Sequence, residues 1–201
     1  MKTLLKLSFA LLVMSANFLA QEPKWSWVNP YPTADEFYDC YFLDSSNCIA
    51  ATSSGIIKST DKGVTWSASQ IPYPNMVITK FFLVDNLYAW AIGDVGYNGN
   101  TKLLKTTDGG IEWFEQAVPS LNVKLNDVFM LDHNNGWLVG SENKIFRTTN
   151  SGLSWVTKNI SSGNGVFNFT KAQFNSLLTG FVTGTYTDFN TYTSKHTVGY
   201  S

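Results

Sequence analysis

The sequence STDKGVTW at residues 59–66 recurs twice in modified form, and this recurrence decides the fold class. The related octets are TTDGGIEW at 106–113 and TTNSGLSW at 148–155. In each octet a Ser or Thr, an Asp or Asn, a Gly and a Trp keep their places. In chain order these residues are Ser59, Asp61, Gly63, Trp66, Thr106, Asp108, Gly110, Trp113, Thr148, Asn150, Gly152 and Trp155.

The chemistry of the octets predicts a chain reversal between two strands. Asp and Asn side chains accept hydrogen bonds from nearby backbone N–H groups, and Gly tolerates a positive φ. The Trp ring can lie over such a turn as an apolar anchor. Asn150 replaces the Asp without a charge, and Glu112 stands where the first copy has Thr65. An acid, base or nucleophile would not survive these exchanges, so we interpret the octets as structural turns.

The repeating unit extends well beyond the octet. The octet Trp residues, at positions 66, 113 and 155, are 47 and then 42 residues apart. Each octet follows two apolar residues and one basic residue, and an aliphatic residue comes five positions after its Trp. Earlier in each unit stand two further apolar stretches, CYFLD, FFLVD and VFMLD, then CIAAT, YAWAIG and GWLVG. Four short strands at this period are the signature of a β-propeller blade.

We therefore expect an all-β chain with four-stranded antiparallel blades at about 37–71, 78–118 and 125–160. A fourth unit, 167–201, is unfinished: LTGFVTG at 178–184 matches NNGWLVG at 134–140, and Ser201 stands where another octet would start. The stretch KWSWV at 24–28 is predicted to be the closing strand of the last blade. About three and a half blades are too few for a ring of four to eight. Residues 21–201 are thus predicted to be an incomplete propeller from a longer polypeptide.

The first twenty residues have the pattern of a secretory signal peptide. Lys2 and Lys6 precede the apolar run 7–14, and Ala20 offers a small residue for cleavage. The alternative interpretation is a short buried N-terminal strand. No other apolar run reaches membrane length. We therefore expect a protein that is secreted or periplasmic after removal of residues 1–20.

Export gives the two cysteines a possible structural role. Cys40 and Cys48 flank a turn, so their thiols could face each other across a hairpin as a disulfide, or stay unpaired and buried. Two Cys and two distant His give no zinc-ligand spacing. The loop 94–100 is similar to a calcium loop but lacks its ligands at Gly96 and Lys105. No metal and no other cofactor is expected.

Charge argues against nucleic acid as a partner. Only 14% of the 201 residues are charged and the formal net charge is −1, whereas phosphate binding needs a basic excess. One basic residue, however, stands directly before each octet: Lys58, Lys105 and Arg147. Such a row could bind a protein or peptide. Alternatively, the three long stems cover apolar strand surface while their heads stay in water. In the fourth unit Tyr200 takes this place.

The octets resemble the BNR or Asp-box repeat, S/T-x-D-x-G-x-T-W. The first copy matches fully, the second has Glu112 for Thr, and the third has Asn150 and Ser154. Together, the GW-x-VG and TTDGG stretches resemble the propeller repeats of photosystem II assembly and stability factors. The resemblance covers nearly the whole mature chain and implies a propeller that holds a reaction-centre protein. Sialidases, xyloglucanases and sortilin-type receptors carry similar repeats.

Two enzyme classes can be weighed by counting residues. Sialidases clamp a carboxylate with three arginines, whereas this chain has Arg147 alone. A xyloglucanase-like hydrolase needs two carboxylates across a groove, and Asp39 and Asp127 occupy equivalent places in their units. The alternative is that both Asp residues cap strand ends. The sequence thus favours an exported non-catalytic scaffold for a protein or peptide, with carbohydrate possible and a secreted glycoside hydrolase fragment as the second hypothesis.

Overall fold

The computed structural model describes residues 35–96, 100–119, 123–160 and 163–190, together with the backbone of 193–200. Within these residues every regular element is a β-strand, and the strands form four separate sheets. The all-β prediction is confirmed. The predicted signal peptide at 1–20, the predicted closing strand at 24–28 and Ser201 lie outside the described residues.

Each sheet is an antiparallel meander in which consecutive strands are neighbours. The first sheet contains β1 (Phe37–Phe42), β2 (Cys48–Thr52), β3 (Gly55–Ser59) and β4 (Ser67–Ala68). The second contains β5 (Val77–Leu83), β6 (Ala89–Val95), β7 (Asn100–Thr106) and β8 (Phe114–Gln116). The third contains β9 (Leu125–Met130), β10 (Gly136–Gly140), β11 (Lys144–Thr148) and β12 (Val156–Asn159). The fourth contains β13 (Gly165–Phe174), β14 (Gly180–Asp188) and β15 (Thr193–Tyr200).

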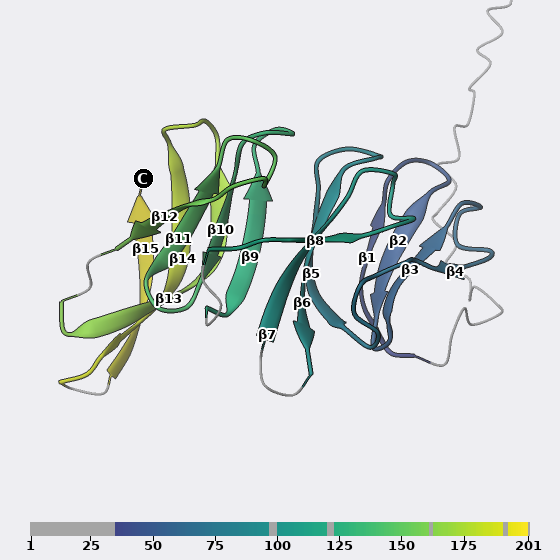
Figure 1. Ribbon diagram of the computed structural model, residues 1–201. Coiled ribbons are helices and arrows are strands. Elements are labelled where there is room, and N and C mark those ends of the chain that lie inside the picture. Colours follow the sequence, from purple (N-terminus) through teal and green to yellow (C-terminus); the bar gives the residue numbers. More distant parts are fainter. Residues whose placement is uncertain (1–34, 97–99, 120–122, 161–162, 191–192, 201) are drawn as a thin grey trace, which may run out of the picture.

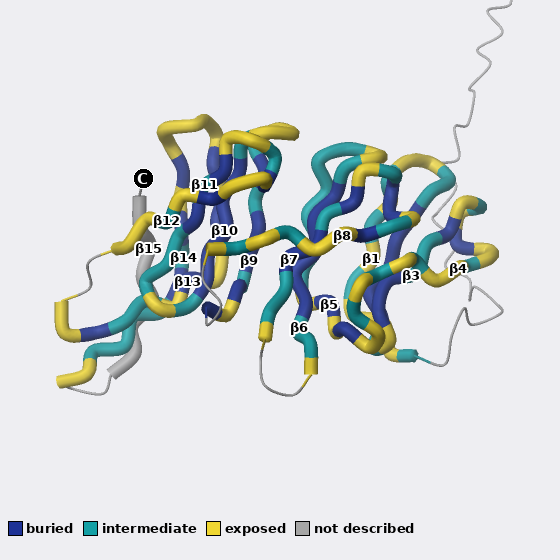
Figure 2. Tube along the Cα trace, viewed as in Figure 1, coloured by how far each residue is buried: buried dark blue, intermediate teal, exposed yellow. Residues whose placement is uncertain are grey.

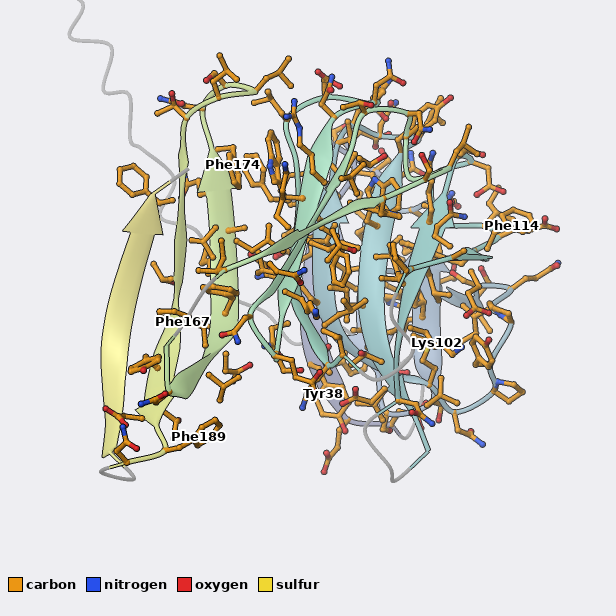
Figure 3. The ribbon with its side chains drawn as sticks, turned by 60° about the vertical axis from the view of Figure 1, so that its left-hand side comes forward. Tyr38, Lys102, Phe114, Phe167, Phe174 and Phe189 are labelled. Carbon is orange, nitrogen blue, oxygen red and sulfur yellow. The ribbon has the colours of Figure 1, made fainter. Side chains whose placement is uncertain are left out.

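The sheets stand side by side in chain order, as Figure 1 shows. Their first strands are in contact one after another, β1 with β5, β5 with β9 and β9 with β13. In the first three sheets the second strand is the most buried, and every residue of β2 and β10 is shielded from solvent (Figure 2). The fourth strands form the outer edge, where Phe114 on β8 is exposed (Figure 3). This is the blade arrangement of a β-propeller, present as an open arc.

The same capping interaction starts the first hairpin of every sheet. Asp44 Oδ1 accepts hydrogen bonds from the backbone N–H groups of the second and third residues after it, both at 2.8 Å. Asp85 and Asp132 do the same in their sheets. Ser176 Oγ takes this role in the fourth sheet, at 3.2 and 3.1 Å. An Asx or Ser turn thus fixes each β-hairpin at its first reversal.

The hydrophobic core consists of three clusters, each between two neighbouring sheets. Ile49 and Phe81 belong to the first cluster, and Trp90 and Val128 to the second. In the third cluster the Trp137 ring stacks on the Phe174 ring, with centroids 3.8 Å apart and planes 4° from parallel. Burial therefore ties each sheet to the next, as expected when a repeat unit cannot bury its own apolar face.

Candidate functional site

In the first octet, polar side chains close the turn. Ser59 Oγ accepts from the Gly63 N–H at 2.8 Å and donates to Asp61 Oδ1 at 2.8 Å. Asp61 also accepts from the Thr65 N–H at 2.8 Å and from the Thr65 hydroxyl at 2.6 Å. The Trp66 indole N–H donates to the Gly63 carbonyl at 2.9 Å. These atoms are used within the turn and not to hold a ligand.

The other two octets repeat the bonds of the leading hydroxyl and of the Asp or Asn, but the indole N–H groups of Trp113 and Trp155 are buried without a hydrogen-bond partner among the described residues. The leading hydroxyl, Thr106 or Thr148, accepts from the octet Gly N–H at 3.0 and 2.9 Å. Asn150 accepts from the Ser154 N–H at 3.0 Å, and its amide donates to the Ser154 hydroxyl at 2.9 Å. The amide thus keeps the backbone hydrogen bond that the Asp61 carboxylate accepts, and it reverses the direction of the side-chain bond. The role of the leading hydroxyl is one that sequence reasoning missed, although a Ser or Thr occupies that position in all three copies.

The octet glycines share a backbone conformation, and two of the three lie where sheets meet. Gly63, Gly110 and Gly152 have φ values of +85°, +86° and +81°, which disfavour a side chain. A Cβ added at Gly110 would lie 2.9 Å from Ile49 Cγ2, and one at Gly152 would lie 2.3 Å from Trp90 Cη2. Both partners belong to the preceding sheet. Each octet is therefore a turn within its own sheet, and the second and third also dock on the sheet before.

Ionisation of Asp61 agrees with a structural role. The hydrogen bonds from the Thr65 hydroxyl and the Thr65 N–H favour the carboxylate and lower the pKa of Asp61 to about 2. A general acid at neutral pH needs a carboxyl pKa that is raised toward the operating pH. Asp61 is therefore a hydrogen-bond acceptor and no proton donor under ordinary conditions.

The basic residues before the octets occupy equivalent positions. Lys58 lies opposite Ile49, Lys105 opposite Trp90 and Arg147 opposite Trp137. The backbone register places Tyr200 opposite Phe181 in the same way. The alignment of the four units is thus correct at these positions. Whether the basic row binds a partner stays a prediction.

Two of these basic side chains reach the octet of the next sheet. Lys105 Nζ donates to the Ser151 carbonyl at 3.0 Å and to the Ser151 hydroxyl, and lies 5.1 Å from the centre of a Trp90 ring. Burial lowers the pKa of Lys105. A Cβ added at Gly109 would lie 3.4 Å from Lys58 Nζ. These contacts give Lys58 and Lys105 a packing role between sheets. The Lys105 ammonium group takes part in that packing, whereas the alternative interpretation had expected the charged heads to stay in water.

The cysteines are free thiols, so the structure holds no disulfide between them. Cys40 lies opposite Ala50, and Cys48 lies opposite Phe42. The two residues are thus diagonal neighbours, with Cα atoms about 7–8 Å apart in such pairs, beyond the usual reach of a disulfide. The sequence placed them across the same hairpin but could not fix this register. Burial raises the pKa of the Cys48 thiol.

A cavity of about 340 Å³ opens among the first strands of the sheets. Its charged lining residues come from three strands that follow one another around the arc, β5, β9 and β13. The lining includes Tyr41, Lys80, Phe82, Asp127, Phe129, Lys171 and Gln173. Pockets that combine apolar surface with a few convergent polar groups are the usual form of a binding site.

One charged residue occupies the equivalent position on the first strand of each sheet. Each first strand contains a bulge, and the residue directly after it is charged. The register makes these four residues equivalent because each faces the corresponding position of the second strand. In order around the arc they are Asp39, Lys80, Asp127 and Lys171, so the sign alternates from sheet to sheet.

Asp127 is the most buried member of this alternating row, with 3% of its surface exposed. Its Oδ2 atom accepts from the Ala172 N–H at 2.9 Å. Its Oδ1 atom is 3.5 Å from Lys80 Nζ, an ion pair without hydrogen-bond geometry, and has no hydrogen-bond partner. Asp127 thus bridges β9 to both neighbouring sheets and keeps one acceptor atom unused.

Two residues after its charged residue, the first strand carries an aromatic side chain in three of the four sheets. Tyr41, Phe82 and Phe129 lie opposite Ile49, Trp90 and Trp137, and Gln173 takes the place in the fourth sheet. The Phe82 and Phe129 rings meet edge to face with centroids 5.2 Å apart. The alternating row thus lies beside an aromatic row on the same strand face, two residues further along.

Sequence analysis found Asp39 and Asp127 but missed the two lysines. A spacing could have revealed them, because each member of the alternating row stands five residues before the Asp or Ser that caps the hairpin. The sheet that carries Lys80 lies between those of Asp39 and Asp127. The two carboxylates therefore lie on sheets that are not neighbours in the arc.

In the part of the chain that the structure describes, no group of three or more His, Cys, Asp or Glu side chains is placed to hold a metal ion. The same residues include no helix that is long and apolar enough to cross a membrane.

Comparison with solved structures identifies the architecture. YCF48 from Cyanidioschyzon merolae is similar with a TM-score of 0.54 and 19% identity, over 83% of this chain and 57% of that chain. YCF48 bound to D1 peptide has a TM-score of 0.52 and 16% identity, over 84% and 70%. An ancestral GH74 enzyme has a TM-score of 0.51 and 14% identity, over 80% and 25%.

These similarities establish a β-propeller fold of the kind found in YCF48 and in GH74 enzymes. The chain spans 57% of the length of the first of these structures. No protein-family model and no curated protein matches its sequence. Because fold similarity at this level of identity is compatible with many functions, function has to be argued from the site.

Proposed function

We propose that this chain is an exported, non-catalytic propeller scaffold that binds a protein or peptide partner in the cavity among its first strands. The observation that carries the proposal is the combination of the alternating row with the aromatic row around one cavity of about 340 Å³. Aromatic rings supply apolar contact area, and charged groups fix orientation. Peptide segments offer both kinds of partner.

The comparisons support a peptide partner by analogy. A YCF48 structure of the same fold type was solved with D1 peptide. The first strands of the present chain contribute buried residues to three hydrophobic clusters between the sheets, and this packing favours rigid cavity walls. A rigid wall lowers the entropic cost of binding a flexible segment. Export remains part of the proposal and rests on the pattern of residues 1–20.

A glycoside hydrolase is the alternative, favoured by the similarity to an ancestral GH74 enzyme. The surroundings of the candidate catalytic carboxylate Asp127 argue against the hydrolase hypothesis. Asp127 is buried, accepts the Ala172 N–H through Oδ2 and lies 3.5 Å from Lys80, so this carboxylate links its strand to both neighbouring sheets. Release of reducing sugar from xyloglucan by the purified chain, abolished by Asp127→Asn in a folded protein, would favour this alternative over the scaffold.

The proposal is tested by selecting peptides from a displayed library with the full chain and measuring affinities by calorimetry. Tyr41→Ala should weaken binding of the selected peptides by about tenfold, because a cavity-lining aromatic is lost. Phe114→Ala is the matched control, since this exposed aromatic lies at the outer edge. If no peptide is enriched, or if both variants bind like the wild type, the proposal is wrong.

A further inference from the structure

We propose that the cavity selects a peptide unit in which a carboxylate lies next to an amide N–H. This inference rests on the proposed function, since it names the chemistry of the partner. It follows from the unsatisfied hydrogen-bonding capacity of three side chains: Lys80, Asp127 and Lys171. The cavity supplies ammonium donors at two positions and one buried acceptor between them.

The cavity lining contains two ammonium groups, those of Lys80 and Lys171, and one carboxylate, that of Asp127. Lys171 is exposed and makes no side-chain hydrogen bond or ion pair within the described residues. Lys80 approaches Asp127 at 3.5 Å without a hydrogen bond, so its N–H groups stay available. An anionic group entering the cavity would therefore be paired with two ammonium groups, and such charge-assisted hydrogen bonds are stronger than neutral ones.

The buried Asp127 Oδ1 atom determines the second feature of the ligand. A buried acceptor without a hydrogen bond is unfavourable, so a ligand that donates to it gains free energy. Oδ1 lies beside Lys80, so the donor and the anion of the ligand must be close together. A backbone N–H adjacent to a carboxylate meets this requirement, and the neighbouring apolar side chain would contact Phe82 and Phe129.

Two sources provide this chemistry: the C-terminal residue of a chain, and an internal Asp. Three capped dipeptides distinguish them: N-acetyl-Ala-Phe with a free carboxylate, its C-terminal amide, and N-acetyl-Asp-Phe-amide. Calorimetry with the full chain should detect binding of one or both acids, and the neutral amide should bind about tenfold more weakly. Raising the salt concentration should weaken the acids only.

The decisive variant is Lys171→Gln, which removes an exposed cation without touching the core. It should weaken binding of the acids by about tenfold and leave that of the amide unchanged. Lys158→Gln is the matched control, because Lys158 is an exposed lysine on the outer strand β12. Unchanged thermal unfolding of both variants would show that each chain is folded.

Several results would overturn the inference. Equal affinities for acid and amide, or wild-type affinity in Lys171→Gln, would show that no carboxylate is bound here, while a peptide-binding scaffold would still stand. Binding of a xyloglucan oligosaccharide in place of all three peptides would assign the cavity to carbohydrate. If the library selection also yields no peptide, the proposed function fails together with the inference.

Discussion

At the scale of single residues, the octets show how a repeated motif can be structural in every polar atom that it uses. The Ser or Thr hydroxyl links the Gly N–H to the Asp or Asn, and the Gly allows the turn to approach the preceding sheet. Sequence reasoning identified the turn because Asn150 keeps the acceptor but loses the charge. It did not identify the docking, since Ile49 and Trp90 are remote in the chain.

Replacing an octet glycine tests this docking. Gly152→Ala should lower the free energy of unfolding by about 2–4 kcal/mol, from the positive φ and from the clash with Trp90. Gly163→Ala is the control: its φ is +61°, but no atom lies within 4 Å of the added Cβ. It should cost about 1–2 kcal/mol. Equal losses in urea titrations of the two variants would mean that the octet does not dock as described.

The pH dependence of stability should reveal how much the Asp61 carboxylate of the first octet stabilises the fold. The pKa of Asp61 is about 2 in the folded chain, below the value of about 3.9 for an unfolded Asp. Because the folded pKa is depressed, Asp61 stabilises the protein above about pH 4, and this contribution is lost as the pH falls toward 2. Asp61→Asn should flatten the stability profile in that window only, as followed by circular dichroism during acid titration. An unchanged profile would contradict the assignment.

At the scale of strands, the repeat predicted most of what the structure shows. The period, the apolar stretches and the octets located four antiparallel units, and the equivalence of Lys58, Lys105 and Arg147 is correct. Two features depend on register and on contacts between sheets, which periodicity alone does not give. These are the diagonal placement of Cys40 and Cys48 and the cavity lined by Lys80 and Lys171.

The contact between Lys105 and the next octet gives an element-scale prediction. Lys105→Ala should cost about 1–2 kcal/mol in the free energy of unfolding, because the Ser151 carbonyl and hydroxyl lose their donor and the Trp90 ring loses its cation. Lys158→Ala, on an exposed face, should stay within about 0.5 kcal/mol of the wild type. Urea titration would refute the packing role if the two variants were indistinguishable.

At the scale of the whole molecule, stability comes from the contacts between sheets. The Trp137 and Phe174 rings stack across the third cluster, and Phe174 is 5% exposed. Phe174→Ala should lower the free energy of unfolding by about 3–5 kcal/mol. Hydrogen exchange should show loss of protection in β13 and β14 before β5 and β6, since a chain of stacked units unfolds locally. Uniform loss over all four sheets would contradict this prediction.

The octet turns hold the fold, whereas the cavity among the first strands is the proposed binding site. The most direct test of this separation compares Asp108→Ala with Lys171→Gln by measuring both unfolding and the affinity of a selected peptide. Asp108→Ala removes the acceptor of the Thr106 hydroxyl and of the Ile111 N–H, so it should lower stability and leave affinity unchanged. Lys171→Gln should weaken affinity and leave stability unchanged. Loss of affinity in Asp108→Ala at full stability, with wild-type affinity in Lys171→Gln, would contradict the central claim.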